Sequence, residues 1–365
     1  MARRMLGEVL LEVENLSVDY LTLKGAVRAV DGATFTLRRG EILGVAGESG
    51  SGKSTLTTAI LRLQRPPAVT AEGKVNYHHR DGSVVDLVPK TDKELRSIRW
   101  DKLAIVMQSA MDALNPVKRL GDQFRDVLQL HNPTMTKAEA ITRAQDLLAM
   151  SGIPRDRVGS YPHEMSGGMR QRALISLALA CDPELVIMDE PTTAVDVVMQ
   201  RTIMGQVLRL QRKLGFAVIF VTHDLSLLLE LSDRLAIMYA GKIVEIGDAH
   251  ELYKNPKHPY TGALRDSFPP LYAPLKRMTG IPGTAPDLMK LPQGCAFAPR
   301  CPVAMPICQT VRPELIPVGA VDAACLRNQP EVAEGQPVIG ATVPVAGTVD
   351  SSEDLVVTDV EGVTP

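Results

Sequence analysis

Apolar and polar residues alternate over residues 8 to 46, in stretches such as "VLLEVENLSV" and "TFTLRRGEILGVAG". A period of two predicts β-strands, and turns are expected at Lys24-Gly25 and Arg39-Gly40. Further along, the continuous apolar runs "ELVIMD" and "FAVIFVTHD" are typical of strands that are buried on both faces of a parallel sheet. The pattern therefore predicts an antiparallel N-terminal part followed by a parallel sheet.

Segments with helical spacing separate these strands. Apolar residues recur three and four positions apart after Lys53, over "GDQFRDVLQL", and through "KAEAITRAQDLLAMSG". The last segment ends at a glycine that is soon followed by proline, as is usual at a helix C-terminus. Helices that alternate with buried strands make the predicted fold class α/β.

The composition changes near residue 269. Nine prolines between residues 269 and 306 exclude long regular elements, so we predict a small separate region over 269–330. Residues 331–365 contain no Lys or Arg and are rich in Val, Gly and acidic residues, which predicts a disordered acidic tail. The main domain is accordingly expected over residues 1–268.

Charge and apolar runs restrict the partners. A formal net charge of -2 argues against nucleic-acid binding, for which a strong basic excess would be expected. The N-terminal apolar stretch is short and interrupted by Glu8 and Glu12, so it is not typical of a signal peptide. The richest apolar run, "ALISLALACDPELVIMDEP", is broken by Asp182 and Glu184 before the roughly 20 residues that span a bilayer. We expect a cytosolic protein that is attached at most peripherally to a membrane.

The segment "GESGSGKST" follows the pattern of a phosphate-binding loop, and it lies between the apolar strand "EILGVA" and the helix-spaced "TLTTAILRL". In such a loop backbone N–H groups surround a phosphate, Lys53 adds a positive charge, and the Ser54 hydroxyl faces Mg2+. A Gly/Ser-rich turn is the alternative, but the strand and the helix stand where a phosphate loop requires them. The predicted nucleotide site consists of Gly47, Ser49, Gly50, Ser51, Gly52, Lys53, Ser54 and Thr55.

Two carboxylates end the predicted strand "LVIMDE". Asp189 can enter the coordination shell of Mg2+, and Glu190 can polarise an attacking water, as phosphoryl transfer requires. Capping of the strand and of the next turn is the alternative role, which the phosphate loop upstream disfavours. His223 ends another buried strand at the edge where open α/β sheets bind ligands, although a histidine there does not by itself indicate function.

The segment "EMSGGMRQRALISLALACDPELVIMDEPTTAVD" places a Ser-Gly-Gly helix start shortly before the carboxylate strand. This combination resembles the signature of the ABC ATPases, and the resemblance extends over roughly residues 8–330. A helix that begins at Ser166, Gly167 and Gly168 offers free N–H groups and a positive dipole end to a phosphate. In the ABC family that phosphate belongs to ATP held by the other cassette of a head-to-tail dimer. The resemblance also implies a helical subdomain at about residues 109–180.

Roles for individual residues follow from the resemblance. It implies that residues 47–55 form the Walker A loop, that Asp189 is the Walker B aspartate and that Glu190 is the catalytic glutamate. Tyr20 matches the aromatic residue that stacks on adenine, although an aromatic residue near a strand end also serves in core packing.

Three further matches concern nucleotide sensing. Gln108 matches the Q-loop glutamine, which in the family contacts Mg2+ and reports the nucleotide state to the membrane subunits. Asp196 matches the D-loop aspartate, and His223 matches the switch histidine that senses the γ-phosphate. Met165 and Val195 replace leucines that are usual in the family, and such apolar exchanges of similar size are tolerated.

Other stretches indicate the branch of the family. The segments "SGGMRQR", "DEPTTAVDV" and "HPYTGAL" resemble the di- and oligopeptide importers, a group that also includes oligosaccharide and nickel importers. The segment "QSAMDALNP" resembles but does not copy the corresponding peptide-importer sequence, so the substrate class stays open. The resemblance implies two permease subunits in the membrane, an extracytoplasmic solute-binding protein and a second ABC ATPase subunit, for which we expect a paralogue rather than a second copy. The chain would then lie on the cytoplasmic face of the cell membrane.

Two alternative functions are different in kind. Soluble ABC ATPases of DNA repair interrupt their cassette with a long coiled coil, and those of translation carry two cassettes in one chain; this sequence has neither feature. ATPases dedicated to iron-sulfur assembly do not carry a proline-rich extension of this kind.

Four of the five cysteines lie near the C-terminal end, at Cys295, Cys301, Cys308 and Cys325. In a cytosolic chain disulfides are disfavoured, and the spacing does not match the paired knuckles of common zinc sites. The residues alone leave zinc, an iron-sulfur cluster and no metal open. The segment "GCAFAPRCPVAMPIC" resembles the extension of peptide-importer ATPases, in some of which the matching cysteines bind a 4Fe-4S cluster. The resemblance therefore implies such a cluster, in a structural or a redox role, with zinc as the second choice.

Overall fold

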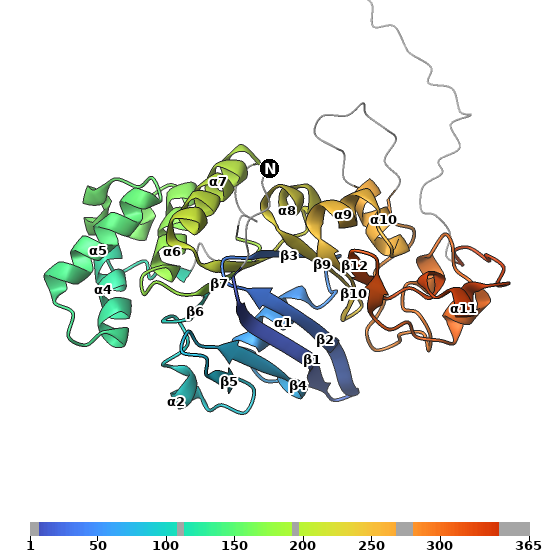
Figure 1. Ribbon diagram of the computed structural model, residues 1–365. Helices are drawn as coiled ribbons and strands as arrows, with labels where there is room; N and C mark the ends of the chain where they lie inside the picture. Colours follow the sequence, from blue (N-terminus) through green and yellow to red (C-terminus); the bar gives the residue numbers. More distant parts are fainter. Residues whose placement is uncertain (1–6, 108–112, 192–196, 268–279, 343–365) are drawn as a thin grey trace, which may run out of the picture.

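The computed structural model describes residues 7–107, 113–191, 197–267 and 280–342. Two β-sheets form its centre, one above the other (Figure 1). The smaller sheet is antiparallel, with strand order β2-β1-β4-β5. Its strands are β1 (Val9–Thr22), β2 (Gly25–Arg38), β4 (Ala68–His78) and β5 (Val84–Asp86).

The larger sheet has the strand order β11-β12-β10-β9-β3-β8-β7-β6. Its neighbours from β9 through β3, β8 and β7 to β6 run parallel, whereas β10, β12 and β11 continue the sheet in antiparallel pairs. The predicted α/β fold with an antiparallel N-terminal part is confirmed. The strands are β3 (Ile42–Ala46), β6 (Leu103–Val106), β7 (Leu185–Asp189), β8 (Ala217–Val221), β9 (Arg234–Tyr239), β10 (Lys242–Asp248), β11 (Ile316–Val318) and β12 (Val321–Ala323).

The central strands are apolar on both faces because both faces are covered. Along β8, Val218 and Phe220 belong to the core between the sheet and the helices, and Ile219 and Val221 belong to the core between the two sheets. Because side chains alternate between the two faces of a strand, one continuous apolar run contributes residues to two separate cores. Figure 1 shows α6, α7 and α8 over one face and the smaller sheet beneath the other.

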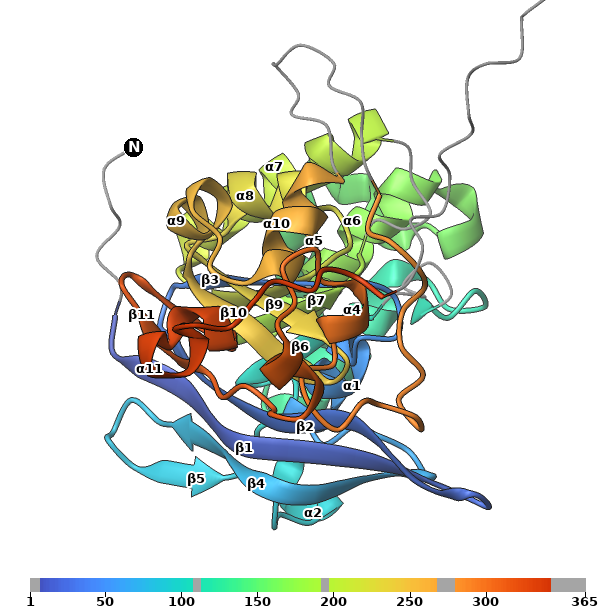
Figure 2. The same cartoon turned by 90° about the vertical axis from the view of Figure 1, so that its right-hand side faces the viewer.

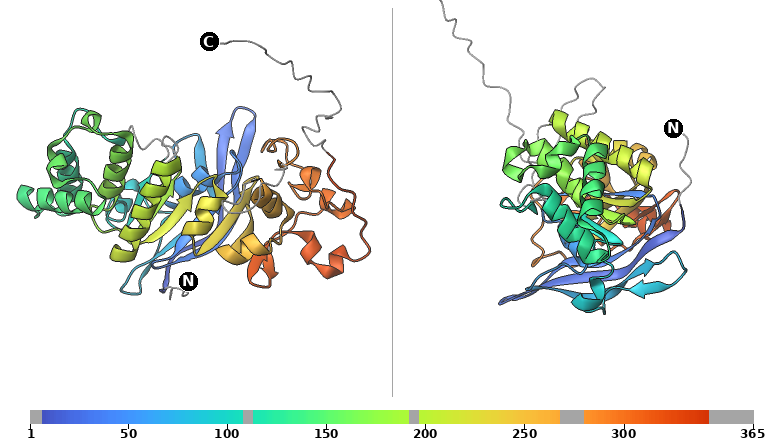
Figure 3. Two further views of the ribbon diagram at one scale, coloured as in Figure 1. Left: turned by 90° about the horizontal axis from the view of Figure 1, so that it is seen from above. Right: turned by 90° about the vertical axis from the view of Figure 1, so that its left-hand side faces the viewer.

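Helices α4, α5 and α6 pack at one end, and the C-terminal extension lies at the opposite end (Figure 3). Among the described residues no helix has both the length and the apolar composition to cross a membrane. The helices are α1 (Lys53–Ile60), α2 (Asp92–Leu95), α4 (Leu120–His131), α5 (Lys137–Met150), α6 (Gly167–Ala178), α7 (Val197–Leu214), α8 (Leu225–Leu231), α9 (Ala249–Lys254), α10 (Pro259–Asp266) and α11 (Pro330–Ala333).

The C-terminal extension, here residues 280–342, is joined to the cassette through the larger sheet. Strand β12 pairs with β10 in antiparallel register, with Gly247 opposite Val321, so the extension adds a hairpin to the core sheet (Figure 2). The rest is short 3-10 turns and loops, in keeping with its prolines. Residues after α11 pack against the loops of the extension, since Ile339 N donates to Ala304 O at 2.7 Å and Thr342 N donates to Pro299 O at 2.9 Å. The remainder of the predicted tail lies outside the described residues.

Candidate functional site

The phosphate loop connects β3 to α1, as the sequence predicts. Gly47, Gly50 and Gly52 have φ angles of 153°, 78° and 101°, in the region that favours glycine. Space also requires glycine, because a Cβ atom at Gly47 would lie 2.2 Å from Met238 O and one at Gly52 would lie 2.2 Å from Ala29 O. The loop is thus pressed against neighbouring backbone on its outer side, which leaves its N–H groups to line the inner side and the start of α1.

Lys53 is buried at the first position of α1, with an exposed fraction of 6%. Its Nζ donates to Gly47 O at 2.8 Å and to Glu48 O at 2.9 Å. Burial lowers the pKa of Lys53, and the negative charges of Glu190, Asp189 and Glu48 act in the opposite direction. The ammonium group is therefore surrounded by carboxylates and carbonyl oxygens, in the place where a phosphate loop uses a cation.

Asp189 ends β7 beside the start of α1. Burial raises the pKa of Asp189, a hydrogen bond from Ser54 lowers it, Glu190 raises it and Lys53 lowers it. Within the described residues, Asp189 Oδ1 and Ser51 Oγ are buried and have no hydrogen-bond partner. A buried carboxylate oxygen without a partner next to a hydroxyl is a donor set that suits Mg2+. The residues present therefore fit the metal that the sequence predicts.

Glu190 and His223 meet at the carboxyl ends of adjacent strands β7 and β8. Glu190 has a φ of 45°, uncommon for a residue with a Cβ atom, and its N–H donates to Val221 O at 2.9 Å. Its Oε1 lies 3.5 Å from His223 Nδ1. Local strain of this kind costs of order 1–3 kcal/mol and is common in active sites. The strand edge thus brings both predicted residues together.

Tyr20 lies at the loop side of α1. It occupies β1 and its Oη is 3.2 Å from Thr55 Oγ1, the residue that follows Ser54 in the phosphate loop segment. Its ring is half-buried and packs against the core between the two sheets. The contact places a tyrosine at the edge of the loop, and its predicted stacking on adenine stays a prediction.

The Ser-Gly-Gly segment starts α6, as the sequence predicts. Ser166 caps the helix, and its Oγ accepts from Met169 N at 3.3 Å. A Cβ atom at Gly168 would lie 2.7 Å from Met199 Sδ, so a larger residue there would have to displace the Met199 side chain of α7. Among the described residues no hydrogen bond or ion pair joins this helix start to the phosphate loop of the same chain. Its role toward the nucleotide of a second cassette stays a prediction.

Two predicted residues cannot be placed. Gln108 and Asp196 lie outside the described residues, as does Val195. Their predicted roles in contacting Mg2+ and in the D-loop stay predictions.

The four C-terminal cysteines line one small cavity of the extension, together with His258 and Phe297. Burial raises the pKa of the Cys295 thiol to about 11 and that of Cys301 to about 12, and it also raises the pKa of Cys325. Within the described part of the chain, no three His, Cys, Asp or Glu side chains are arranged to hold a single metal ion. The thiols therefore surround a common space without converging on one point.

The structure also connects residues that the sequence did not single out. Arg300, in the extension, forms a bidentate ion pair with Glu48 of the phosphate loop, and Tyr260 Oη accepts from Glu48 N at 2.8 Å. Tyr260 belongs to the "HPYTGAL" segment, which served above only as a mark of the family branch. Nothing in the sequence near Arg300, which precedes Cys301, indicates that its partner is Glu48, 252 positions away.

Comparisons with known proteins agree with this geometry. The family model described as ABC transporter matches residues 30–193, and the model described as the C-terminal region of oligopeptide/dipeptide transporters matches residues 244–308. The dipeptide transport ATP-binding protein DppD of Lactococcus lactis is 42% identical over 305 residues, which cover 83% of this chain and 86% of that protein. The oligopeptide transport ATP-binding protein OppD of Bacillus subtilis is 43% identical over 302 residues, with coverage of 82% and 83%.

Solved structures share the fold. A bacterial ABC transporter cassette, solved as a dimer, matches with a TM-score of 0.58 and 26% identity and covers 66% of this chain and 99% of its own length. The same cassette in a post-hydrolysis state, bound to ADP and phosphate, matches equally well with a TM-score of 0.58. The relatives span most of the chain, and the two family models cover the phosphate site and the first part of the extension. This chain belongs to the ATP-binding subunits of the oligopeptide/dipeptide family of ABC transporters, and it is an ABC ATPase.

Proposed function

We propose that the chain hydrolyses ATP at the phosphate loop to drive the uptake of di- or oligopeptides through partner permeases. One observation carries the catalytic part of the proposal: the buried Lys53, the unpartnered Asp189 oxygen and the Glu190–His223 pair all lie at the carboxyl edge of three neighbouring parallel strands. This edge is where open α/β sheets bind their ligands.

Each residue has a separate task in the proposed reaction. The loop N–H groups and Lys53 bind the β- and γ-phosphates of ATP. Ser54, Asp189 and Gln108 would hold Mg2+, which supplies neutralisation of phosphate charge. Glu190 orients and polarises the water that attacks the γ-phosphate, and His223, which lies 3.5 Å from Glu190, would sense that phosphate.

A second cassette completes the site. The capped helix start at Ser166, Gly167 and Gly168 would bind the γ-phosphate of ATP held by that second subunit, and Asp196 would lie between the two. The related cassette solved as a dimer supports this arrangement. Closure of the dimer on ATP would shift the permeases toward their outward conformation, and hydrolysis would reset them, which is a population shift by differential affinity.

Helices α4 and α5 are the proposed docking surface for the permeases at the cytoplasmic face of the membrane. Helix α5 packs directly on the signature helix α6, and α4 packs on α5, so movement at the nucleotide can reach both. Peptide is the substrate named for the relatives DppD and OppD, whereas oligosaccharide or nickel would suit a chain of the same fold. An extracytoplasmic solute-binding protein would deliver the substrate.

Co-purification tests the transport assignment. The tagged chain, expressed with its neighbouring reading frames, is expected to purify with two permeases and a second, paralogous cassette. In liposomes, its ATPase rate should rise when solute-binding protein loaded with peptide is added. If the chain is found only free, with full ATPase activity and no permease, then a soluble non-transport ABC ATPase is the correct assignment.

We further propose that the cysteine cavity holds a 4Fe-4S cluster. The four cysteines line one cavity. The thiolate ligands of a 4Fe-4S cluster lie further apart than those of a single metal ion, so this arrangement suits a cluster. The N–H groups of Phe297, Val303 and Arg327 hydrogen-bond the sulfurs of Cys295, Cys301 and Cys325, each two residues before the donor, and lower the thiol pKa values against burial. Such N–H groups stabilise thiolates, the form that binds metal.

Metal analysis tests this second proposal. Anaerobically purified protein is expected to be brown and to contain iron and acid-labile sulfide, with a visible absorbance that bleaches on reduction. Stoichiometric zinc without iron would refute the cluster. We propose a structural role, since proline-rich loops bury little apolar surface of their own, and comparison of transport-coupled ATPase with oxidised and reduced cluster distinguishes it from a redox gate.

A further inference from the structure

Arg300 of the extension reaches across to the phosphate loop. Its guanidinium donates to both oxygens of Glu48, from Nη1 to Oε2 at 2.7 Å and from Nη2 to Oε1 at 2.8 Å. Arg300 is 4% exposed, so this pair is shielded from solvent on the arginine side. A bidentate, buried arginine–carboxylate pair fixes distance and orientation, unlike a single contact at the surface.

Other contacts hold Arg300 in this position. Its Nε donates to Pro282 O at 2.6 Å, its Nη1 lies 3.2 Å from Tyr239 Oη, and its guanidinium lies 5.8 Å from the centre of the Tyr239 ring. Tyr239 ends β9, directly beside β3 and the loop. The guanidinium group is thus fixed from the extension and from the core sheet at once.

The backbone of Glu48 is held from the same side. Its N–H donates to Tyr260 Oη, and the Tyr260 ring packs against Phe297 with ring centres 5.4 Å apart. Phe297 also lines the cavity of the four cysteines. Side-chain packing is therefore continuous from the cysteine cavity to the second residue of the phosphate loop.

The charge of Glu48 explains why this matters for ATP. Glu48 lies between Gly47 and Gly50, in the loop that must receive phosphates. Its backbone carbonyl accepts from Lys53 Nζ at 2.9 Å. A free carboxylate so close to bound phosphates would repel them and compete for Lys53. The bidentate pair neutralises Glu48 and fixes the direction in which its side chain lies.

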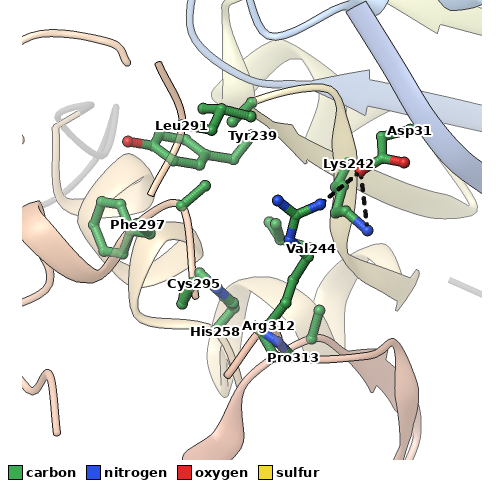
Figure 4. Close-up of a pocket in the computed structure, with 13 residues that line it drawn as sticks. Asp31, Tyr239, Lys242, Val244, His258, Leu291, Cys295, Phe297, Arg312 and Pro313 are labelled. Atoms are coloured by element: carbon green, nitrogen blue, oxygen red, sulfur yellow. Dashed lines mark hydrogen bonds and ion pairs between the residues drawn. The ribbon is translucent and has the colours of Figure 1, made fainter. Parts of the chain in front are cut away.

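The extension has a second charged contact with the cassette, away from the loop. Arg312 Nη1 and Lys242 Nζ lie 3.3 Å and 3.2 Å from Asp31 Oδ2, at one side of a pocket that Tyr239 and Phe297 also line (Figure 4). Arg312 is 47% exposed and does not contact the phosphate loop. It offers a matched control, since it is an arginine of the same extension paired with another carboxylate.

We infer that Arg300 is a positioning residue for nucleotide binding, which orients and neutralises Glu48 so that the phosphate loop accepts ATP. The inference rests on the proposed binding of ATP at the loop and extends it: the extension becomes part of the nucleotide site. Its loop around Arg300 and Cys301 then links the state of the cysteine region to the affinity for ATP.

The test measures the dissociation constant of MgATP for the full chain by calorimetry, with thermal unfolding recorded for every variant. Arg300→Met is expected to weaken ATP binding about tenfold, within the range typical of coupling between sites. The double variant Arg300→Met/Glu48→Gln removes the repelling carboxylate and is expected to recover to within about threefold of wild type. Arg300→Lys, which keeps the charge but not the fork, should fall between Arg300→Met and wild type. Arg312→Met should leave the dissociation constant unchanged.

Recovery in the double variant separates positioning from folding. An arginine that only stabilises the extension would lower the unfolding temperature without a change in ATP affinity, or would weaken binding in a way that Glu48→Gln does not repair; either result overturns the inference. Lys53→Ala separates a failure of the proposed ATP site from a failure of the inference about Arg300. If Lys53→Ala binds ATP as wild type does, the proposed nucleotide site itself is wrong, whereas loss of binding in Lys53→Ala with unchanged binding in Arg300→Met rejects only the inference.

Discussion

Glu190 Oε1 lies 3.5 Å from His223 Nδ1, although the two residues are 33 positions apart in the sequence and meet through the pairing of β7 with β8. Their exposure differs, because the Glu190 side chain is 17% exposed and the His223 side chain is 65% exposed. The carboxylate is therefore held within the strand edge, whereas the imidazole faces solvent. This asymmetry suits a buried base and an exposed sensor.

The first prediction concerns the base. Glu190→Gln keeps the shape of the side chain but cannot accept a proton, so hydrolysis should fall by about 10²–10⁴-fold, the usual contribution of a general base. ATP binding to the loop should remain. Phosphate release and ATP affinity in the assembled complex are the measurements, and Glu72→Gln, on an exposed side chain of β4, is the control. Full turnover in the Glu190 variant would contradict the assignment, once a catalytic glutamate in the partner cassette has also been substituted.

The second prediction concerns His223. His223→Ala removes the exposed imidazole and its contact with Glu190. We expect ATP hydrolysis to fall about 10²-fold with little change in ATP affinity, since the loop and Lys53 bind the phosphates on their own. Single-turnover hydrolysis and nucleotide titration separate the two effects. His250→Ala, on an exposed side chain of α9, should leave both unchanged. A large loss of affinity in His223→Ala would assign the histidine to binding instead.

The third prediction uses the glycines. In Gly52→Ala the new Cβ atom would lie 2.2 Å from Ala29 O, at a φ of 101°. We expect the free energy of unfolding to fall by at least about 1–3 kcal/mol, the usual cost of overpacking, and ATP binding to be lost. Gly205→Ala is the matched control, because nothing lies within 4 Å of its Cβ position in α7. That variant should be more stable by about 0.5–1 kcal/mol. Chemical denaturation and ATP titration check both.

Local sequence predicted most of the catalytic edge, for a physical reason. Asp189 ends a strand, and Lys53 and His223 follow strands, whose apolar runs are visible in the sequence. The carboxyl ends of parallel strands must meet at one edge. A strand that is buried on both faces can be recognised in the sequence by its continuous apolar run. A phosphate loop can be recognised because it requires glycines at fixed spacing.

The extension's contacts could not be predicted in the same way. The prolines indicate irregular structure correctly, yet nothing near Val321 shows that it pairs with Gly247 in the core sheet. Arg300 and Glu48 interact across 252 residues, and each alone is an ordinary charged residue in a loop. Long-range pairing depends on how elements pack, a property that neither periodicity nor a short motif carries.

The fourth prediction concerns the cysteines. Cys301→Ser replaces a buried thiol by a hydroxyl that is a much poorer ligand for iron, so the iron content and visible absorbance of the protein should be lost. Cys181→Ser lies in the turn after α6, away from the cavity, and should keep both. Iron and sulfide analysis of anaerobically purified variants is the measurement. Equal iron in wild type and Cys301→Ser would exclude the four-cysteine cavity as the site.

The fifth prediction tests how the extension is attached. In Gly247→Ala the new Cβ atom would lie 2.5 Å from Val321 Cγ1 and 2.9 Å from Val321 Cα, so β12 must move away from β10. We expect a loss of about 1–3 kcal/mol in the free energy of unfolding, as for other overpacked sites, together with faster proteolysis between residues 280 and 342 than in wild type. In the control Gly262→Ala the new Cβ atom would lie 3.7 Å from Pro256 Cγ, an ordinary contact. This variant should resist proteolysis as well as wild type does.

The same variant connects the sheet to the nucleotide. Movement of β12 displaces the loops that carry Arg300, so Gly247→Ala should also weaken MgATP binding if Arg300 positions Glu48. Adding Glu48→Gln should restore that affinity while proteolysis stays fast, because the substitution removes the repelling charge without repairing the sheet. Fast proteolysis with unchanged ATP affinity would mean that the Arg300–Glu48 contact survives detachment of the hairpin, and the extension would then be held to the phosphate loop by this ion pair and the Tyr260–Phe297 packing rather than through β12.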